Sequence, residues 1–228
     1  MALWTVLAAS AVLLVAAFAW GRIRAAAQAR SSARLDYFAV CAPLFSAVRI
    51  RATDHGFARL NGQRSGHLVD LQAVPDTLTF RKLPSLWLMV TLPTPQPVAA
   101  SADFMARPTG TEVFSNFGSL PVQVATPPGF PTDVAVRTDD PAGLPQGAVL
   151  DAVRAAFFSP RVKEVLVSPR GLRLVWLAEE ADRSRYLIFR DAELGMRPLP
   201  PEVLTPLLDH LGAIADALAV ADRQGEAA

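Results

Sequence analysis

The first twenty positions of the chain carry no charged side chain, and nearly all of them are apolar. As an α-helix, residues 2–20 would span roughly 28 Å, which matches the roughly 30 Å hydrocarbon core of a bilayer. Trp4 and Trp20 stand near the two ends of this run, where amphipathic rings favour the lipid headgroups. The pattern therefore predicts one transmembrane helix.

The charged positions that follow this run are all basic at first. Arg22, Arg24, Arg30 and Arg34 precede the first acidic residue, Asp36. Basic residues beside a span are retained on the cytoplasmic side of a membrane. The sequence thus predicts a single-pass protein of a bacterial inner membrane, with its N-terminus outside and its C-terminal domain in the cytoplasm. The four arginines and the two tryptophans are the candidate membrane-contact residues.

Three other interpretations of this run remain open. Ala17 and Ala19 resemble the cleavage site of a secretory signal peptide, although such a peptide carries its positive charge before the apolar run. A buried helix of a soluble domain is the second, and nineteen positions without a charge are unusual for it. The third is a span that packs against other membrane-protein subunits, which the small residues near its middle would permit.

Between residues 45 and 93 the spacing of apolar positions becomes that of β-strands. A turn cluster at 61–66 is followed by alternating apolar positions at 67–73 and again at 77–81. Residues 86–92 form a continuous apolar run that is too short for a bilayer, and they predict a central strand buried on both faces. We therefore expect a β-meander in this half of the chain.

Proline content and the helical spacing of apolar residues divide the rest of the chain into segments. Residues 1–24 are the predicted anchor with its basic flank, and 25–44 are a juxtamembrane helical segment. The proline-rich residues 94–131 predict a connection between two halves. Residues 132–223 form the second half, and 224–228 a frayed tail.

The second half has regular patterns that predict two amphipathic helices and four strands. The predicted elements are a short strand at Val134 and Val136, a helix at 146–158, hairpin strands at 162–167 and 172–177, a strand at 185–190, and a last helix. That helix has a one-sided apolar stripe consisting of Leu204, Leu207, Leu208, Leu211, Ile214 and Leu218. Strands joined by short turns favour antiparallel pairing, so we expect the α+β class.

Composition excludes several functions. Lys and Arg number 22 against 21 Asp and Glu, and this net charge of +1 argues against a nucleic-acid partner. The single cysteine excludes an intramolecular disulfide and a cysteine-based zinc site. Beyond the membrane and possible subunits within it, the sequence identifies no partner.

The sequence contains no phosphate-binding loop, dinucleotide-binding glycine pattern, zinc-protease helix, paired-cysteine motif or serine nucleophile elbow. The isolated candidates for chemistry are Cys41, His55 beside Asp54, His67 near Asp70, and the pair Asp139-Asp140. His67 and Asp70 would lie on opposite faces of one strand, and apolar neighbours would make Cys41 inert. We predict no catalytic residue, metal ligand or cofactor.

A mixed-charge stretch near residue 180 is the candidate partner surface. It contains Glu179, Glu180, Asp182 and Arg183, and we add Arg170 at the predicted hairpin tip. The favoured function is a membrane-anchored, non-enzymatic accessory or interaction domain. The alternatives are a hydrolase-like enzyme using Cys41 or a histidine, and a module that binds a ligand or lipid at the membrane surface.

Overall fold

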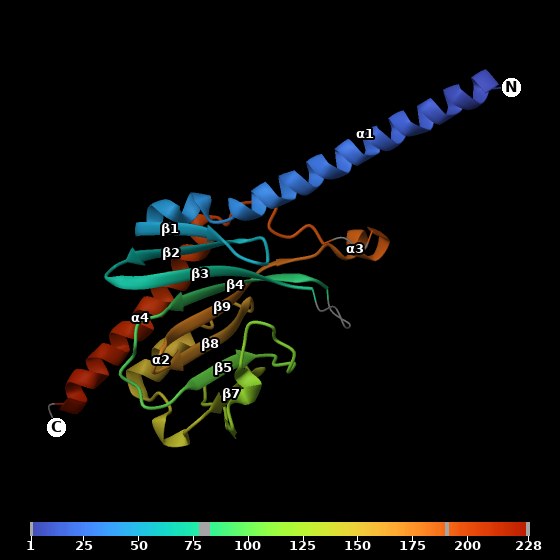
Figure 1. Ribbon diagram of the computed structural model, residues 1–228. Helices are drawn as coiled ribbons and strands as arrows, with labels where there is room; N and C mark the ends of the chain where they lie inside the picture. The colour runs from blue at the N-terminus through green and yellow to red at the C-terminus, as the bar shows by residue number, and fades with distance from the viewer. Residues whose placement is uncertain (1, 78–82, 190–191, 227–228) are drawn as a thin grey trace.

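The computed structural model describes residues 2–77, 83–189 and 192–226, which form a long N-terminal helix and a nine-stranded antiparallel sheet (Figure 1). In chain order the strands are β1 (Ser46–Ala52), β2 (Ala58–Arg64), β3 (His67–Asp76), β4 (Ser85–Leu92), β5 (Ala102–Ala106), β6 (Val122–Val124), β7 (Val134–Thr138), β8 (Val162–Ser168) and β9 (Gly171–Glu180). Their order across the sheet is β1-β2-β3-β4-β9-β8-β5-β7-β6, so the two halves of the chain meet at the β4–β9 pair. The predicted α+β class is confirmed.

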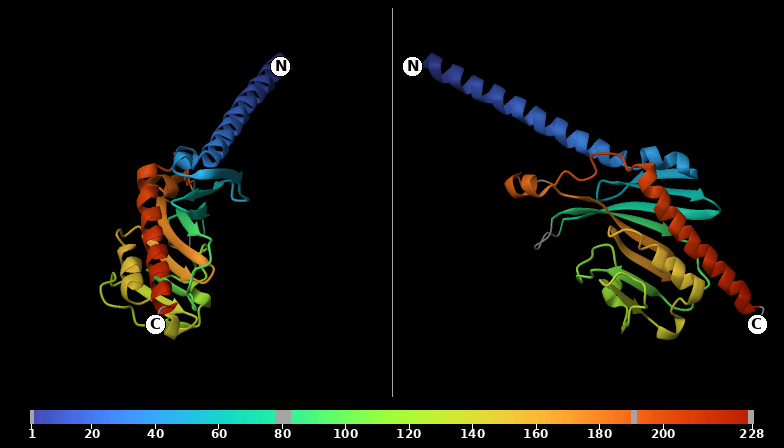
Figure 2. Two further views of the ribbon diagram at one scale, coloured as in Figure 1. Left: turned by 90° about the vertical axis from the view of Figure 1, so that its left-hand side faces the viewer. Right: turned by 180° about the vertical axis from the view of Figure 1, so that it is seen from behind.

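Four α-helices accompany this sheet in the described residues. They are α1 (Ala2–Leu35), α2 (Gly147–Ala155), α3 (Arg183–Phe189) and α4 (Pro201–Glu226), with short 3-10 turns η1 (Ala39–Leu44), η2 (Phe117–Ser119) and η3 (Pro141–Gly143). The edge-on view in Figure 2 shows α2 and α4 on the same side of the sheet. Helices therefore cover one face of the sheet, while α1 projects away from it.

The apolar stripe of α4 forms the centre of the core. Its six large residues are all buried, namely Leu204, Leu207, Leu208, Leu211, Ile214 and Leu218. They pack with Val149 and Val153 of α2 and with the inward side chains of the strands. A stripe of this size cannot remain in water without a large free-energy cost, so it holds both helices on the sheet.

The helix α1 differs from α4 although both are long and apolar enough, by length and composition, to cross a membrane. The side chains from Val12 to Trp20 are all exposed, whereas the apolar face of α4 lies within the domain core. The N-terminal run therefore contributes no packing to the domain in the described structure. The predicted N-terminal apolar helix is confirmed.

The base of α1 is built into the core rather than joined by a flexible linker. Tyr37, Phe38 and Cys41, which follow the helix directly, are fully buried. The Leu199 N–H donates to the Tyr37 carbonyl over 2.8 Å, and the Cys41 thiol donates to the Leu199 carbonyl over 3.0 Å. Arg34 also donates from Nε to the Leu194 carbonyl and lies over the Phe57 ring. The helix is thus held in a defined direction.

The first four strands form the predicted meander. Ser65 and Gly66 connect β2 to β3 with φ angles of 49° and 83°, as a two-residue hairpin turn requires. In β4 the side chains of Leu86, Leu88 and Val90 are buried on the helical face. The other face of β4 is half-exposed, which corrects the prediction of a strand buried on both sides. Most of the strand expected at 77–81 lies outside the described residues.

Two other expectations need correction. The proline-rich connection contains β5 and β6, and β5 lies fully buried between β8 and β7. The charged Asp103, second of the five residues of β5, interrupts the apolar pattern that would otherwise predict a buried strand. Residues 185–190, expected as a strand, belong largely to the helix α3. The Asp182 carboxylate caps α3 by accepting the Arg185 N–H over 2.7 Å.

The face of the sheet opposite the helices has two parts. Over β5 and β8 it is covered by the connection that follows β5, whose Phe114 and Phe117 are buried. The Phe114 ring lies 5.0 Å from the Trp87 ring, measured between centroids. Over β2, β3 and residues 89–92 of β4 no element of the described structure covers this face, and its side chains are largely polar.

Candidate functional site

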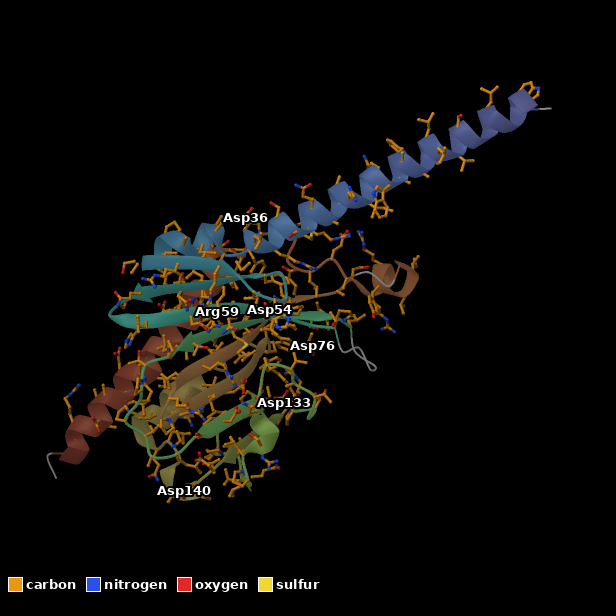
Figure 3. The ribbon with its side chains drawn as sticks, viewed as in Figure 1. Asp36, Asp54, Arg59, Asp76, Asp133 and Asp140 are labelled. Atoms are coloured by element: carbon orange, nitrogen blue, oxygen red, sulfur yellow. The ribbon has the colours of Figure 1, made fainter. Side chains whose placement is uncertain are left out.

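The uncovered sheet face owes its polarity to the two-residue period of its strands. Leu60 and Leu71 point to the helices, so their neighbours point to the opposite side. Those neighbours include Arg59 on β2 and Gln72 on β3, which are cross-strand partners. Figure 3 shows Arg59 over the upper strands of the sheet. A polar row therefore crosses the sheet above an apolar core.

Asp70 organises this row. Its buried carboxylate accepts hydrogen bonds from Arg59 Nε over 2.6 Å and Nη2 over 2.8 Å. Asn61 and Gln72 donate their side-chain amides to the same carboxylate over 2.6 and 2.8 Å. Four donors from two strands thus satisfy one buried charge and fix the surrounding side chains. Asp70 consequently has a structural role beneath the surface.

A groove of about 340 Å³ continues from this row towards the β8–β9 hairpin. Its lining contains three arginines and one acid, together with amide and hydroxyl groups: Arg59, Asn61, Asp70, Gln72, Met89, Thr91, Pro93, Leu166, Ser168, Arg170, Gly171, Leu172 and Arg173. Because Arg59 is paired with Asp70 and Arg173 with Glu164, the net positive charge of the groove is that of the exposed Arg170. Such a lining favours a partner with negative charge or exposed hydrogen-bond acceptors.

A buried carboxyl pair lies below the groove, under the covered part of the same face. Asp103 of β5 and Glu164 of β8 are both almost completely inaccessible. Glu164 Oε1 accepts from Ser115 Oγ over 2.5 Å and from Arg173 Nη2 over 3.0 Å. Burial first, and then the charge of Glu164, raise the pKa of Asp103 well above its ordinary value. The raised pKa favours the protonated form of Asp103, and Arg173 links the pair to the groove.

Asp103→Asn is expected to raise the melting temperature at neutral pH. A raised pKa of a buried acid in the folded state means that stability falls as pH rises from the unfolded-state pKa of 3.8 towards the folded value. Asparagine keeps the shape and an N–H donor towards Glu164 but cannot ionise. Thermal melts of the full chain from pH 5 to 9 would measure this. A native protein whose stability does not fall with pH across this range would contradict the assignment.

A second hollow, of about 420 Å³, lies at the opposite strand ends of this face. It contains a buried ion pair in which Lys163 Nζ lies 3.0 Å from Glu112 Oε1. Lys163 Nζ also donates to the carbonyls of Ala106 over 2.8 Å and Arg107 over 2.6 Å. Sequence reasoning missed this pair, although Lys163 and Glu164 stand inside an otherwise apolar strand. Charges at such positions signal a buried polar contact.

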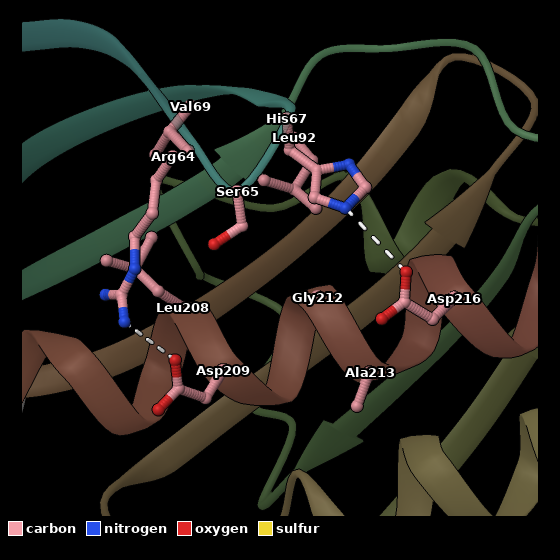
Figure 4. Close-up of a pocket in the computed structure, with 10 residues that line it drawn as sticks. All are labelled: Arg64, Ser65, His67, Val69, Leu92, Leu208, Asp209, Gly212, Ala213 and Asp216. Atoms are coloured by element: carbon pink, nitrogen blue, oxygen red, sulfur yellow. Dashed lines mark hydrogen bonds and ion pairs between the residues drawn. The ribbon is translucent and has the colours of Figure 1, made fainter. Parts of the chain in front are cut away.

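A third hollow lies between the β2–β3 hairpin and α4, with a volume of about 290 Å³ (Figure 4). Arg64 Nη2 contacts Asp209 Oδ1 over 2.9 Å, and His67 Nε2 lies 4.0 Å from Asp216 Oδ1. Ser65 completes a serine–histidine–aspartate composition, but Figure 4 shows its hydroxyl pointing away from the His67 ring. Asp216 is also mostly exposed. The geometry is that of an ion-paired contact between hairpin and helix, not of a nucleophile with its base.

The other residues with potential chemistry are separated. Cys41 is buried, and burial together with the charge of Glu202 raises its pKa to about 11. Asp139 accepts the Ser101 N–H, and Asp140 caps the η3 turn. His67 and Asp70 lie on opposite faces, as predicted. Within the described residues, no three His, Cys, Asp or Glu side chains lie close enough to hold a metal ion.

The five residues of the candidate partner surface do not form one patch. Arg170 lies at the hairpin end of β9 and lines the groove, whereas Glu179 and Glu180 lie at its other end. Glu179 Oε2 accepts the Gly195 N–H over 2.8 Å, so it fastens the segment before α4. Asp182 is the cap of α3, and Arg183 is exposed on that helix.

The candidate membrane-contact residues also divide into two groups. Trp4, Trp20, Arg22 and Arg24 are exposed along the upper part of α1, and the Arg24 guanidinium lies 5.1 Å from the centroid of the Trp20 ring. Arg34 contacts the domain at the base of the helix, as described above. Arg30 lies between them and is half-buried.

Comparisons with known proteins place no further constraint on this site, because no protein-family description, no curated protein and no solved structure matches the chain. The functional argument therefore rests on the geometry of the helix α1, of the uncovered sheet face and of its cationic groove.

Proposed function

We propose that this protein is a single-pass membrane protein whose cytoplasmic α+β domain binds a partner through the uncovered face of its sheet. The observation that carries the proposal is the one-sided construction of the domain. Helices α2 and α4 bury one face of the sheet, whereas the opposite face over β2, β3 and residues 89–92 of β4 has a polar row and a cationic groove. The domain is non-enzymatic in this proposal, and its partner is an anionic surface of another protein.

The attachment of α1 supports this proposal. Its exposed apolar run has the length of a membrane span, and residues 21–35 extend it by about 22 Å. Because Tyr37 and Phe38 are buried in the core, the domain is held at a defined distance and orientation from the membrane. With its orientation fixed, the domain directs the same sheet face towards a partner in or beside the same membrane, which lowers the entropic cost of binding.

The anchor and its orientation are tested together. The native protein is expected to keep its N-terminus, to remain in the membrane pellet after alkaline carbonate extraction, and to leave a periplasmic reporter fused after Ala228 silent. The physical reason is the uncharged run followed by arginines. Intact mass is the measurement for the first point. A mature chain beginning at Trp20 would show a cleaved signal peptide, and an active reporter would reverse the orientation.

Binding at the groove is tested by site-specific photo-crosslinking of the full chain in its membrane. A photoreactive residue is placed at Thr91 in the groove, and the matched control is placed at Ala213, exposed on the helical side. We expect one defined adduct from Thr91 and none from Ala213. Charge reversal of the exposed hairpin residue, Arg170→Glu, is expected to lower the yield several-fold because the partner is anionic.

The same adducts from both positions, or an adduct whose yield is unchanged in Arg170→Glu, would refute the proposed binding face. Thermal melts of the Arg170 variant serve as the control for folding. Arg170 is exposed at a hairpin tip, so its replacement is expected to change stability by no more than about 0.5 kcal/mol.

A further inference from the structure

The short helix α3 is an excursion of the chain between the end of β9 and the base of α1. Asp182 caps the start of α3, and the segment that follows α3 returns to the base of α1. In that segment the Leu194 carbonyl accepts from Arg34, and the Leu199 N–H donates to Tyr37. Figures 1 and 2 show α3 projecting from the domain on the same side as α1. The segment after α3 thus contacts the base of α1, while α3 itself projects outward from the domain.

The exposed side of α3 is unusually apolar. Leu187 is 57% exposed and Ile188 is 72% exposed. Within the described residues from 36 onwards, no other large apolar side chain is more than half exposed. Exposure of two adjacent large aliphatic side chains at one projecting point costs free energy in water, so such a point is typically an interaction surface.

The charged residues within α3 itself are basic, and acids flank the helix at Glu179, Glu180, Asp182 and Glu193. Arg183 and Arg185 are exposed on the same helix. Asp182 caps the helix and Glu193 pairs with Arg185 over 2.5 Å, whereas Glu180 is exposed before the helix. A short helix with aliphatic residues on one side and arginines beside them is typical of a segment that lies in the headgroup region of an anionic membrane.

The helix α3 can also reach the headgroup region of a membrane whose boundary lies at Trp20. Fourteen helical residues separate Arg34 from Trp20, which corresponds to roughly 21 Å along the axis. Five Cα–Cα steps separate Phe189 from Leu194, and they can span at most about 17 Å. A spanning helix is tilted by about 20° on average, and a tilt towards α3 shortens the remaining distance.

We propose that α3 is a second membrane contact, in which Leu187 and Ile188 enter the boundary between headgroups and acyl chains while Arg183 faces anionic headgroups. This inference rests on the proposed membrane anchor. The contact would restrain rotation of the domain about α1, so that the groove faces a constant direction relative to the membrane plane. A second copy of the chain or a protein partner is the competing occupant of these apolar residues.

The test uses the full chain with single introduced cysteines, labelled with an environment-sensitive fluorophore and reconstituted in nanodiscs. Cys41 is buried with a raised pKa, so the label goes to the introduced thiol. The test position is Leu187→Cys. The negative control is Leu68→Cys, which is 48% exposed at the opposite strand ends, and the positive control for the span is Leu13→Cys. The lipids are phosphatidylcholine and phosphatidylglycerol, with or without doxyl-labelled quencher lipid.

We expect quencher lipid to lower the emission from position 187 at least twofold and to leave position 68 nearly unchanged, while position 13 is strongly quenched. Quenching at 13 without quenching at 187 would overturn the second contact and leave the anchor intact. Absence of quenching at 13 would overturn the anchor itself. A blue-shifted emission at 187 that does not respond to quencher lipid would identify a protein contact and would also overturn the proposal.

Discussion

Leu211→Ala is expected to destabilise the protein by about 2–5 kcal/mol, the usual cost of deleting a fully buried leucine side chain. Leu211 lies in the middle of the α4 stripe with no exposed surface, among the core residues that join α4 to α2 and the sheet. The replacement removes apolar contact and leaves a cavity that rigid neighbours fill only in part. Because a typical domain is stable by 5–15 kcal/mol, this loss would be a large fraction of the total.

Thermal denaturation of the full chain in detergent, followed by circular dichroism, measures this effect. The matched control is Asp216→Ala on the same helix, where the side chain is 80% exposed and lies 4.0 Å from His67. We expect this control to change stability by no more than about 0.5 kcal/mol. If Leu211→Ala melts like the native protein but loses a partner during purification, the stripe is an interface instead of a core.

Lys163→Met is the second replacement with a large expected effect, a loss of about 3–5 kcal/mol. It removes the charge that compensates Glu112, whose side chain is only 7% exposed. It also removes the donor that satisfies the carbonyls of Ala106 and Arg107, which begin the connection covering the sheet. An unpaired buried carboxylate and two unsatisfied carbonyls each cost free energy, whereas methionine preserves most of the side-chain volume.

The pH dependence gives this prediction a specific signature. Burial alone would raise the pKa of Glu112, but hydrogen bonds from Thr109 and the Lys163 ammonium outweigh it and lower the pKa to about 2. The stability contributed by the pair is therefore complete above the ordinary pKa of 4.5 and is lost as pH falls towards 2. Melting curves of the native protein and of Lys163→Met should accordingly converge as the pH is lowered through this interval.

Two further variants separate the ion pair from nonspecific effects. The neighbouring Arg161→Met removes an exposed charge and is expected to melt close to the native protein. The double variant Lys163→Met with Glu112→Leu is expected to recover part of the loss, because it no longer leaves a buried charge unpaired. A single variant Lys163→Met that melts like the Arg161 variant would refute a compensating role for the pair.

Much of the fold was predictable because its signals are local. An uncharged run followed by arginines predicts the exposed apolar part of α1, and a stripe at helical spacing predicts the buried face of α4. The two hairpins around Gly66 and Gly171 were also predictable, since turn residues separate short apolar segments there. In each case residues within about ten positions of one another determine the element.

The tertiary structure decided whatever depends on contacts between distant segments. Strand β5 forms because β7 and β8 supply its hydrogen bonds on both sides, and nothing in its five residues around Asp103 indicates this locally. Helix α3 replaces a predicted strand, and in the described structure it pairs with no strand of the sheet. The spacing of apolar residues within one strand does not predict which other strand will lie beside it.

The candidate sites show the same division. The sequence by itself determined that Cys41 would be buried, that His67 and Asp70 would lie on opposite faces, and that the chain begins with an apolar helix. Only the tertiary structure brought Arg59, Arg170 and Arg173 into one groove and paired Lys163 with Glu112. The physical reason is that charge positions on separate strands become neighbours only through sheet order. Here the β4–β9 pair joins the two halves of the chain, and the local spacing of apolar residues does not predict this pairing.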